Sequence, residues 1–249
     1  MIALNFGTAY AKLKMIDHLK KLETLRGAAI HPPHFLEKLQ NVKCWQHDRL
    51  ARTYLDLASE TRYAPAVSFF LDELYDAGDS IKNSALRDRE LIRMYPTIKR
   101  VLPKFAYDAV KKALELDVLA EEFDQALATQ LDGGKITEAS YAIAFRAAGR
   151  RDDRLRQVEL MQEVGKSLDV VVKKPLIYST LKMLRGPSKL AGLAAMQRFL
   201  ETGFTAFRHM KGADYFLETI AYREALLINR IFDKIADPFE VIKTWQPRN

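Results

Sequence analysis

The sequence predicts an all-α protein, a compact bundle of about ten helices in one domain spanning residues 1–249. Hydrophobic residues recur at three- and four-residue steps through most of the chain, which is the pattern of amphipathic helices. Glycine, proline and short polar runs interrupt this pattern where helix ends are expected. The valine run in "DVVVKKP" could form a short strand, but a helix tolerates it equally well.

The first half of the chain is predicted to hold five helices. Gly27 and "HPPH" separate the first two. Asp79 or Ser80 is suited to cap the fourth helix, and Pro103 suits the first turn of the fifth. The fifth carries leucines and Phe123 on one face. The expected helices are 8–26, 34–60, one that contains "FFLDELY" (69–75), 80–101 and 103–131.

The second half is predicted to hold shorter helices followed by two long ones. Gly149 and "RRDD" precede one helix, and "RGPS" separates two others. The expected ranges are 154–168, a helix beginning at Pro175, 188–210 and 213–235. If the chain has two subdomains, the glycine-containing stretch near 132–136 is the expected break.

Composition indicates a soluble, basic protein of the cytoplasm. Hydrophobic residues make up 48% and charged residues 29%, which is usual for a folded globular chain. No apolar run reaches the roughly 18 residues that a membrane span requires, and the N-terminus does not resemble a signal peptide. A lone Cys44 agrees with a reducing compartment.

The stretch "FFLDELY" is predicted to place an aromatic residue in an acidic face. At 100° per residue, Phe69 points away from the apolar stripe, toward Asp72, Glu73 and Asp76. One interpretation is that a second layer of helices covers Phe69 and that basic residues meet the acids. The other is a docking surface, because aromatic anchors ringed by charge resemble interface hot spots. The stripe itself consists of Val67, Phe70, Leu71, Leu74 and Tyr75.

The same stretch carries a resemblance to a known family. It is preceded by "WQHDRLARTYLDLASETRYAPAVS" and followed by "RDRELIRMYPTIKRVLP", "ALELDVLAEEFDQALA" and "GFTAFRHMKGADYFLETIAYRE". With these segments the chain resembles the uncharacterised bacterial proteins named for an FFLEELY motif, over about residues 39–232. Asp72 stands where the motif has Glu. The resemblance implies a bacterial protein and carries over no catalytic residue, ligand or cofactor.

A basic interval in the second half points to an anionic partner. The net charge is +7, and residues 170–200 contain no acid. Arg185, Ser188 and Lys189 surround "RGPS" at an expected helix start, where backbone N–H groups favour an anion. The alternatives are a solvated basic face or a contact with the acidic helix 103–131. Nucleic acid is a weaker hypothesis, because the interval lacks interleaved aromatic residues.

Histidine, cysteine and carboxylate clusters do not predict a metal site. "HPPH" and "CWQH" place two histidine-containing pairs nine residues apart, but Cys44 lies about 15 Å along a helix that starts near His34. Asp117, Glu121 and Asp124 share one face of the fifth helix, which predicts a solvated acidic face. No metal or cofactor is therefore expected.

The leading functional hypothesis is a binding protein whose partner is another protein and whose contact face is Phe69, Asp72, Glu73 and Asp76. The second is a helical bundle that binds a phosphate-bearing or other anionic small ligand, as an enzyme or a carrier, near the turn 185–189. Because no catalytic signature is present, the sequence leaves open whether the protein is an enzyme.

Overall fold

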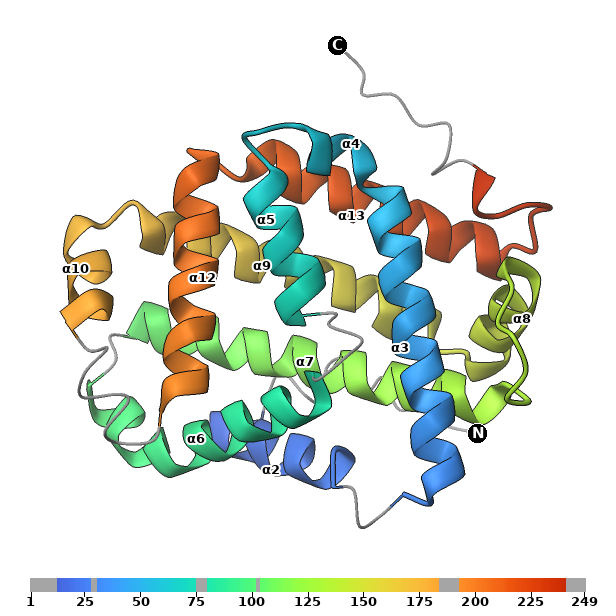
Figure 1. The fold of residues 1–249 in the computed structure, drawn as a ribbon, viewed down its shortest axis with the longest axis horizontal. Helices are drawn as coiled ribbons and strands as arrows, with labels where there is room; N and C mark the ends of the chain where they lie inside the picture. Colours follow the sequence, from blue (N-terminus) through green and yellow to red (C-terminus); the bar gives the residue numbers. More distant parts are fainter. Residues whose placement is uncertain (1–12, 28–30, 75–79, 102–103, 184–192, 241–249) are drawn as a thin grey trace.

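The all-α prediction is confirmed by the structure, a computed structural model that describes residues 13–27, 31–74, 80–101, 104–183 and 193–240 (Figure 1). These residues form eleven α-helices and one π-helical turn, and they include no strand. None of the helices in the described ranges combines the length and apolar character needed to cross a bilayer.

The helix bounds agree with most of the predicted ranges. Pro175 begins a helix as expected, and Ser80, one of the two expected cap residues, is the first residue of the fourth predicted helix. In chain order the elements are α2 (Met15–Leu25), α3 (Pro33–Thr53), α4 (Leu55–Ser59), α5 (Ala64–Phe69), the π-helical turn η1 (Phe70–Leu74), α6 (Ser80–Val101), α7 (Lys104–Gln130), α8 (Glu138–Ala148), α9 (Arg151–Val172), α10 (Pro175–Met183), α12 (Ala194–Met210) and α13 (Asp214–Phe232).

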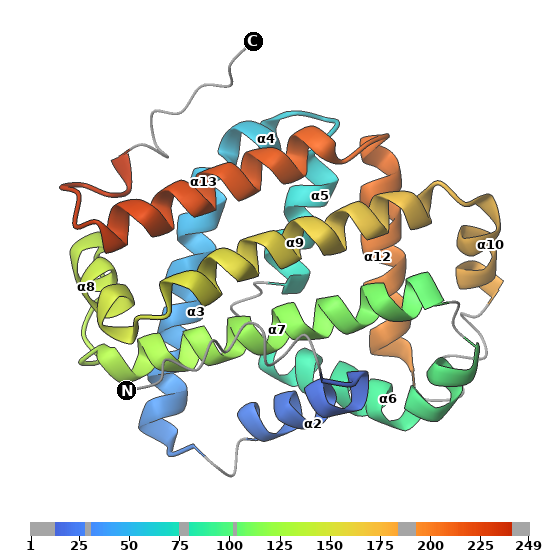
Figure 2. The ribbon, with the colours of Figure 1, turned by 180° about the vertical axis from the view of Figure 1, so that it is seen from behind.

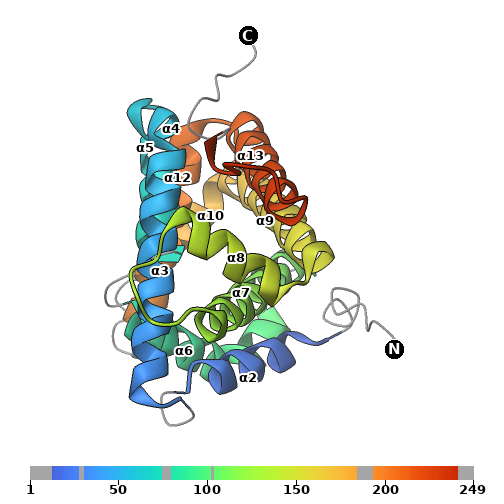
Figure 3. The ribbon, with the colours of Figure 1, turned by 90° about the vertical axis from the view of Figure 1, so that its right-hand side faces the viewer.

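The helices form two crossing layers. Figure 1 shows α3, α5 and α12 in front, while α7, α9 and α13 run across behind them. Figure 2 shows the second set from behind, with α2 and α6 along the lower edge, and the edge-on view in Figure 3 separates the two layers. Helices α8 and α10 lie at opposite ends. Leu127 of α7 packs in one apolar cluster with Leu39 and Val42 of α3 and so joins the two layers, whereas Leu119 and Phe123 of α7 cluster with Leu160 of α9.

Three segments differ from the sequence-based expectation. The predicted helix 34–60 is interrupted at Tyr54. The buried Arg223 guanidinium donates a 2.7 Å hydrogen bond to the Thr53 carbonyl, and we attribute the interruption to this contact. The valine run completes α9 rather than forming a strand. Helix α8 was not anticipated, although Thr137 and Ser140 cap its first turn reciprocally.

The stretch near 132–136 connects α7 to α8. Helix α8 packs against α7, and α9 runs along α7 as well. A subdomain break at this connection stays a prediction.

Phe69 is buried, which agrees with the interpretation that a second layer of helices covers it. Its side chain is 7% exposed and packs on Phe199 of α12, with ring centroids 5.4 Å apart. Helix α12 forms this second layer over α5, and the π-helical turn begins directly after Phe69, at Phe70.

Two of the three carboxylates on the acidic face of α7, Glu121 and Asp124, are largely buried, contrary to the sequence-based expectation, while the Asp117 side chain is 40% exposed. The Arg26 guanidinium donates to Asp88 at 2.7 Å and to Glu121 at 3.2 Å, and it also pairs with Asp117. Lys43 of α3 donates to Glu121 at 2.9 Å and lies 3.6 Å from Asp124. Cations from the preceding segments therefore neutralise the α7 carboxylates, and Glu121 is only 3% exposed.

Replacing Gly203 by alanine is predicted to destabilise the fold. A Cβ atom at Gly203 would lie 2.7 Å from Cζ of Phe69, closer than carbon atoms approach. Alanine usually stabilises a helix relative to glycine, so a loss of about 1–3 kcal/mol in urea unfolding would report overpacking. The matched control is Gly134→Ala, where no atom lies within 4 Å, and it should change stability by less than about 0.5 kcal/mol. A Gly203→Ala protein as stable as the parent would contradict this packing.

Asp124 is predicted to make stability depend on pH. Burial raises the pKa of Asp124 from 3.8 to about 6. Between these values the folded state binds more protons than the unfolded state, so this residue's contribution to stability falls as pH rises from about 4 to 6. The parent should thus lose stability relative to Asp124→Asn across this window, measured by urea unfolding at each pH.

Comparing the parent with Asp124→Asn cancels the effect of His18 on stability, which has the opposite pH dependence to that of Asp124. Burial lowers the pKa of His18 to about 4, which makes stability fall as pH drops from 6.5 toward 4 in both proteins. The exposed carboxylate change Asp132→Asn is the control and should not alter the pH profile. Parallel profiles for the parent and Asp124→Asn would show that Asp124 is not the group responsible.

Candidate anion-binding pocket

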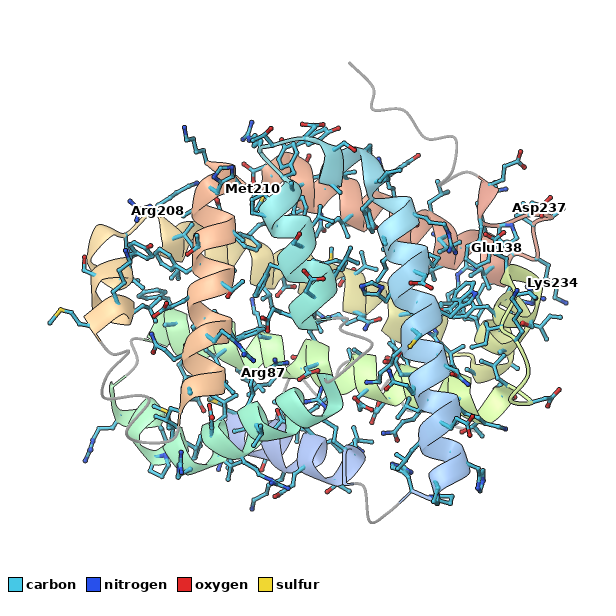
Figure 4. The ribbon with its side chains drawn as sticks, viewed as in Figure 1. Arg87, Glu138, Arg208, Met210, Lys234 and Asp237 are labelled. Atoms are coloured by element: carbon cyan, nitrogen blue, oxygen red, sulfur yellow. The ribbon has the colours of Figure 1, made fainter. Side chains whose placement is uncertain are left out.

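Two helix ends that are far apart in the sequence meet beside α10. Helix α9 ends at Val172, and only two residues separate it from Pro175, the first residue of α10. Pro175 disfavours a helical conformation at Lys174, so the chain turns sharply there. Helix α12 packs against both α9 and α10, and Figure 4 shows Arg208 near its end, on the α10 side.

A cavity of about 210 Å³ lies at this junction. Val172 and Phe207 form its apolar floor, and Gly212 completes the wall. We call it the anion pocket after its charged and polar lining: Asp169, Lys173, Lys174, Tyr178, Arg208 and Lys211. Its volume is well above the roughly 10–15 Å³ that a cavity needs to hold one water molecule.

The loop after α12 is held in place by Arg62. Lys211 adopts a left-handed conformation, with φ of 55°, and Gly212 follows with φ of 129°. Arg62 Nε donates to the Met210 carbonyl at 2.7 Å, and Arg62 Nη2 donates to the Gly212 carbonyl at 3.3 Å. This arrangement satisfies carbonyls at the helix end and fixes the backbone that carries Lys211.

Positive charge exceeds negative charge in the pocket. Lys173 donates to Asp169 Oδ2 at 2.6 Å, and this hydrogen bond raises the pKa of Lys173. Asp214, in the first turn of α13, also favours the charged form of Lys173. Within the described part of the chain, three further cations form no ion pair: Lys174, Arg208 and Lys211.

Tyr178 connects two of the surrounding cations. Its ring stacks on Phe204 at 5.3 Å, and Arg208 Cζ and Lys182 Nζ lie 4.9 Å and 4.4 Å from the ring centroid. A hydrogen bond with Lys182 lowers the pKa of the Tyr178 hydroxyl, and the charge of Arg208 acts in the same direction. The hydroxyl is thus held in a positive environment that also favours a bound anion.

Cations near helix C-termini also have a structural role, because they complement the partial negative charge there. Lys173 and Lys211 are the cap residues of α9 and α12. Here the cations of two helix ends and Lys174 surround one cavity. This places more positive charge around it than either helix end requires for its own partial negative charge. Chemically, the arrangement can hold an oxyanion by charge-assisted hydrogen bonds above an apolar floor.

The sequence identified only part of this pocket. Lys173, Lys174 and Lys182 belong to the acid-free interval that suggested anion binding. Arg208 and Lys211 follow in "FRHMKG", and their approach to α9 depends on how α12 packs. Arg185, Ser188 and Lys189, the predicted anion-binding residues, lie outside the described residues, so anion binding by them stays a prediction.

The predicted docking face is reduced by the burial of Phe69. Asp72 is exposed, and Glu73 Oε2 lies 3.6 Å from Arg87 Nη1. This ion pair is the kind of contact expected if basic residues meet the acids. Asp76 lies outside the described residues. Contact of Asp72 and Glu73 with a partner protein stays a prediction, but the buried Phe69 does not serve as the aromatic anchor of that contact.

The histidine and cysteine pairs are engaged in local contacts. His31 Nε2 lies 3.1 Å from the Leu25 carbonyl, and Gln40 donates to Cys44 Sγ at 3.5 Å. His47 Nδ1 lies 3.4 Å from Asp48 Oδ1. Within the described ranges, no group of three histidine, cysteine or carboxylate side chains is arranged to hold a metal ion.

Comparison with known proteins gives one match. A family model described as a domain of unknown function (DUF8198) matches residues 26–238, which include every residue that lines the anion pocket. Neither the curated proteins nor the solved structures yield a match. The likeness to FFLEELY-motif proteins and a bacterial source stay predictions.

Lys182→Ala is predicted to raise the pKa of Tyr178 toward the ordinary tyrosine value of about 10, because it removes the hydrogen bond and charge that lower it. The measurement is a pH titration of ¹³C-labelled tyrosine by NMR, with the Tyr178 signal assigned from Tyr178→Phe. Lys166→Ala, on the exposed side of α9, is the control. An unchanged Tyr178 titration in Lys182→Ala would contradict the described contact.

Proposed function

Since the chain belongs to the DUF8198 domain family, whose description assigns no activity, we propose a function from the pocket: the protein binds a small anionic ligand between α9, α10 and α12. The anion lies against Lys174, Arg208 and Lys211, above the apolar floor of Val172 and Phe207. This makes the protein a helical binding protein for small molecules.

One observation carries the proposal. Lys174, Arg208 and Lys211 surround a cavity, and no described carboxylate pairs with any of them. Elsewhere in the described structure, cations with little exposure, such as Arg26, Lys43 and Arg223, are paired with carboxylates, whereas the three pocket cations are exposed. Leaving several like charges together costs free energy unless solvent or a ligand compensates them.

The pocket favours a small ligand over the larger partners considered from sequence. Protein docking through the acidic face has lost its anchor, because Phe69 is covered by α12. Nucleic acid binding in general uses an extended basic surface, with affinity that falls steeply with salt. A cavity of about 210 Å³ instead fits a single compact group.

Inorganic phosphate is predicted to stabilise the parent protein, and the double variant Lys174→Gln with Arg208→Gln should lose most of this effect. A ligand that binds only the folded state stabilises it by about 2.7 kcal/mol at roughly 100 times its Kd. Removing two charge-assisted contacts should weaken binding by at least about tenfold. Thermal unfolding across a phosphate series at constant ionic strength measures both.

The matched control is Lys20→Gln with Lys166→Gln, which removes the same net charge from exposed positions on α2 and α9. It should respond to phosphate as the parent does. If the parent shows no phosphate-dependent shift, or if both double variants lose it equally, the pocket is not an anion site and the proposal fails.

A further inference from the structure

A carboxylate is buried within the wall of the anion pocket. Asp169 is 7% exposed, and its Oδ2 atom accepts the hydrogen bond from Lys173. Its Oδ1 atom is buried and has no hydrogen-bond partner among the described residues. A buried acceptor without a partner costs free energy, and native proteins contain few of them. Asp169 also belongs to the lining of the pocket, so its carboxylate is an acceptor that a ligand's donor could reach once the side chain turns.

A hydrogen-bond acceptor inside a site for anions makes the affinity of the site depend on whether the anion carries a proton. A fully deprotonated oxyanion has no hydrogen to offer and is repelled by the Asp169 carboxylate. A protonated oxyanion can turn its O–H toward the carboxylate, and such O–H···O⁻ hydrogen bonds are short and strong. Among tetrahedral anions at neutral pH, sulfate has lost all its protons, whereas inorganic phosphate always keeps one.

We propose that the anion pocket selects inorganic hydrogen phosphate, with Asp169 accepting the hydrogen bond of its P–OH group while Lys174, Arg208 and Lys211 hold the ionised oxygens. This rests on the proposed function and names its ligand. Phosphate monoesters share the tetrahedral group, but with a second pKa of about 6 they have mostly lost their last proton at pH 7.5. Asp169 therefore disfavours them as well.

The side chains have the freedom that this arrangement requires. A carboxylate rotates readily about its Cβ–Cγ bond, so either oxygen of Asp169 can turn toward the cavity. The Lys173 side chain is 61% exposed, so it can move from Asp169 to the bound anion. Exchange of partners between Lys173, Asp169 and the ligand leaves each charged group compensated.

Asp169 could instead serve only to pair with Lys173 at the end of α9, as an i, i+4 ion pair. Such a structural role predicts a change in stability on mutation but no change in the choice between anions. Anion selectivity therefore separates the two roles.

The experiment measures the affinities of the full chain for phosphate, sulfate and phenyl phosphate by isothermal titration calorimetry at pH 7.5 and constant ionic strength. The parent should bind phosphate at least about tenfold more tightly than the other two anions, which is the size expected for one charge-assisted hydrogen bond. In Asp169→Asn the ratio of the affinity for phosphate to the affinity for sulfate should fall to near one, because the carboxylate that repels sulfate is absent.

Lys173→Gln is the matched control, since it breaks the same ion pair but keeps the carboxylate. It should retain the preference for phosphate over sulfate. If Asp169→Asn does not fold, Asp169→Glu displaces the carboxylate by one methylene and should also reduce the preference.

The outcomes separate the two proposals. Equal affinities for phosphate and sulfate in the parent, or an unchanged ratio in the Asp169 variants, overturn the role of Asp169 but leave anion binding in place. Tighter binding of phenyl phosphate than of phosphate overturns the assignment to free phosphate. Binding of none of the three anions removes the proposed function itself.

Discussion

The pairing of buried charges around α7 is the constraint on which the arrangement of the first half depends. Arg26 lies between carboxylates of two helices, with Asp88 on α6 and Asp117 and Glu121 on α7. Removing one partner of such a group leaves an uncompensated buried charge, which typically costs several kcal/mol. Helices α2, α3, α6 and α7 therefore keep the relative positions that bring these groups together.

The pairing of the α7 carboxylates also affects the charge balance at the other end of the molecule. Asp117, Glu121 and Glu122 of α7 pair with Arg26, Lys43 and Arg150 rather than with the basic interval that follows α9. That interval and the end of α12 contribute cations to one cavity, and among the described residues of its lining Asp169 is the only carboxylate. An excess of positive charge around a hollow with an apolar floor is what a small anion requires.

The sequence predicted the helices well because their apolar periodicity is local. It could not predict the break at Tyr54, since this depends on Arg223, which is distant in sequence. Whether Phe69 is covered or exposed was left open for a similar reason, because the answer depends on its contact with α12. Of the candidate site, the lysines after α9 were visible as an acid-free interval. Their combination with Arg208 and a buried Asp169 is a product of tertiary packing.

Locating the bound anion tests the central claim most directly. Backbone amide NMR signals of the full chain, followed during titration with inorganic phosphate, report where the ion binds. The account predicts saturable shifts concentrated at the corner between α9 and α10 and in the loop between α12 and α13, including Lys174 and Gly212. Shifts scattered over the basic surface without saturation, or saturable shifts centred on another part of the fold, would contradict it.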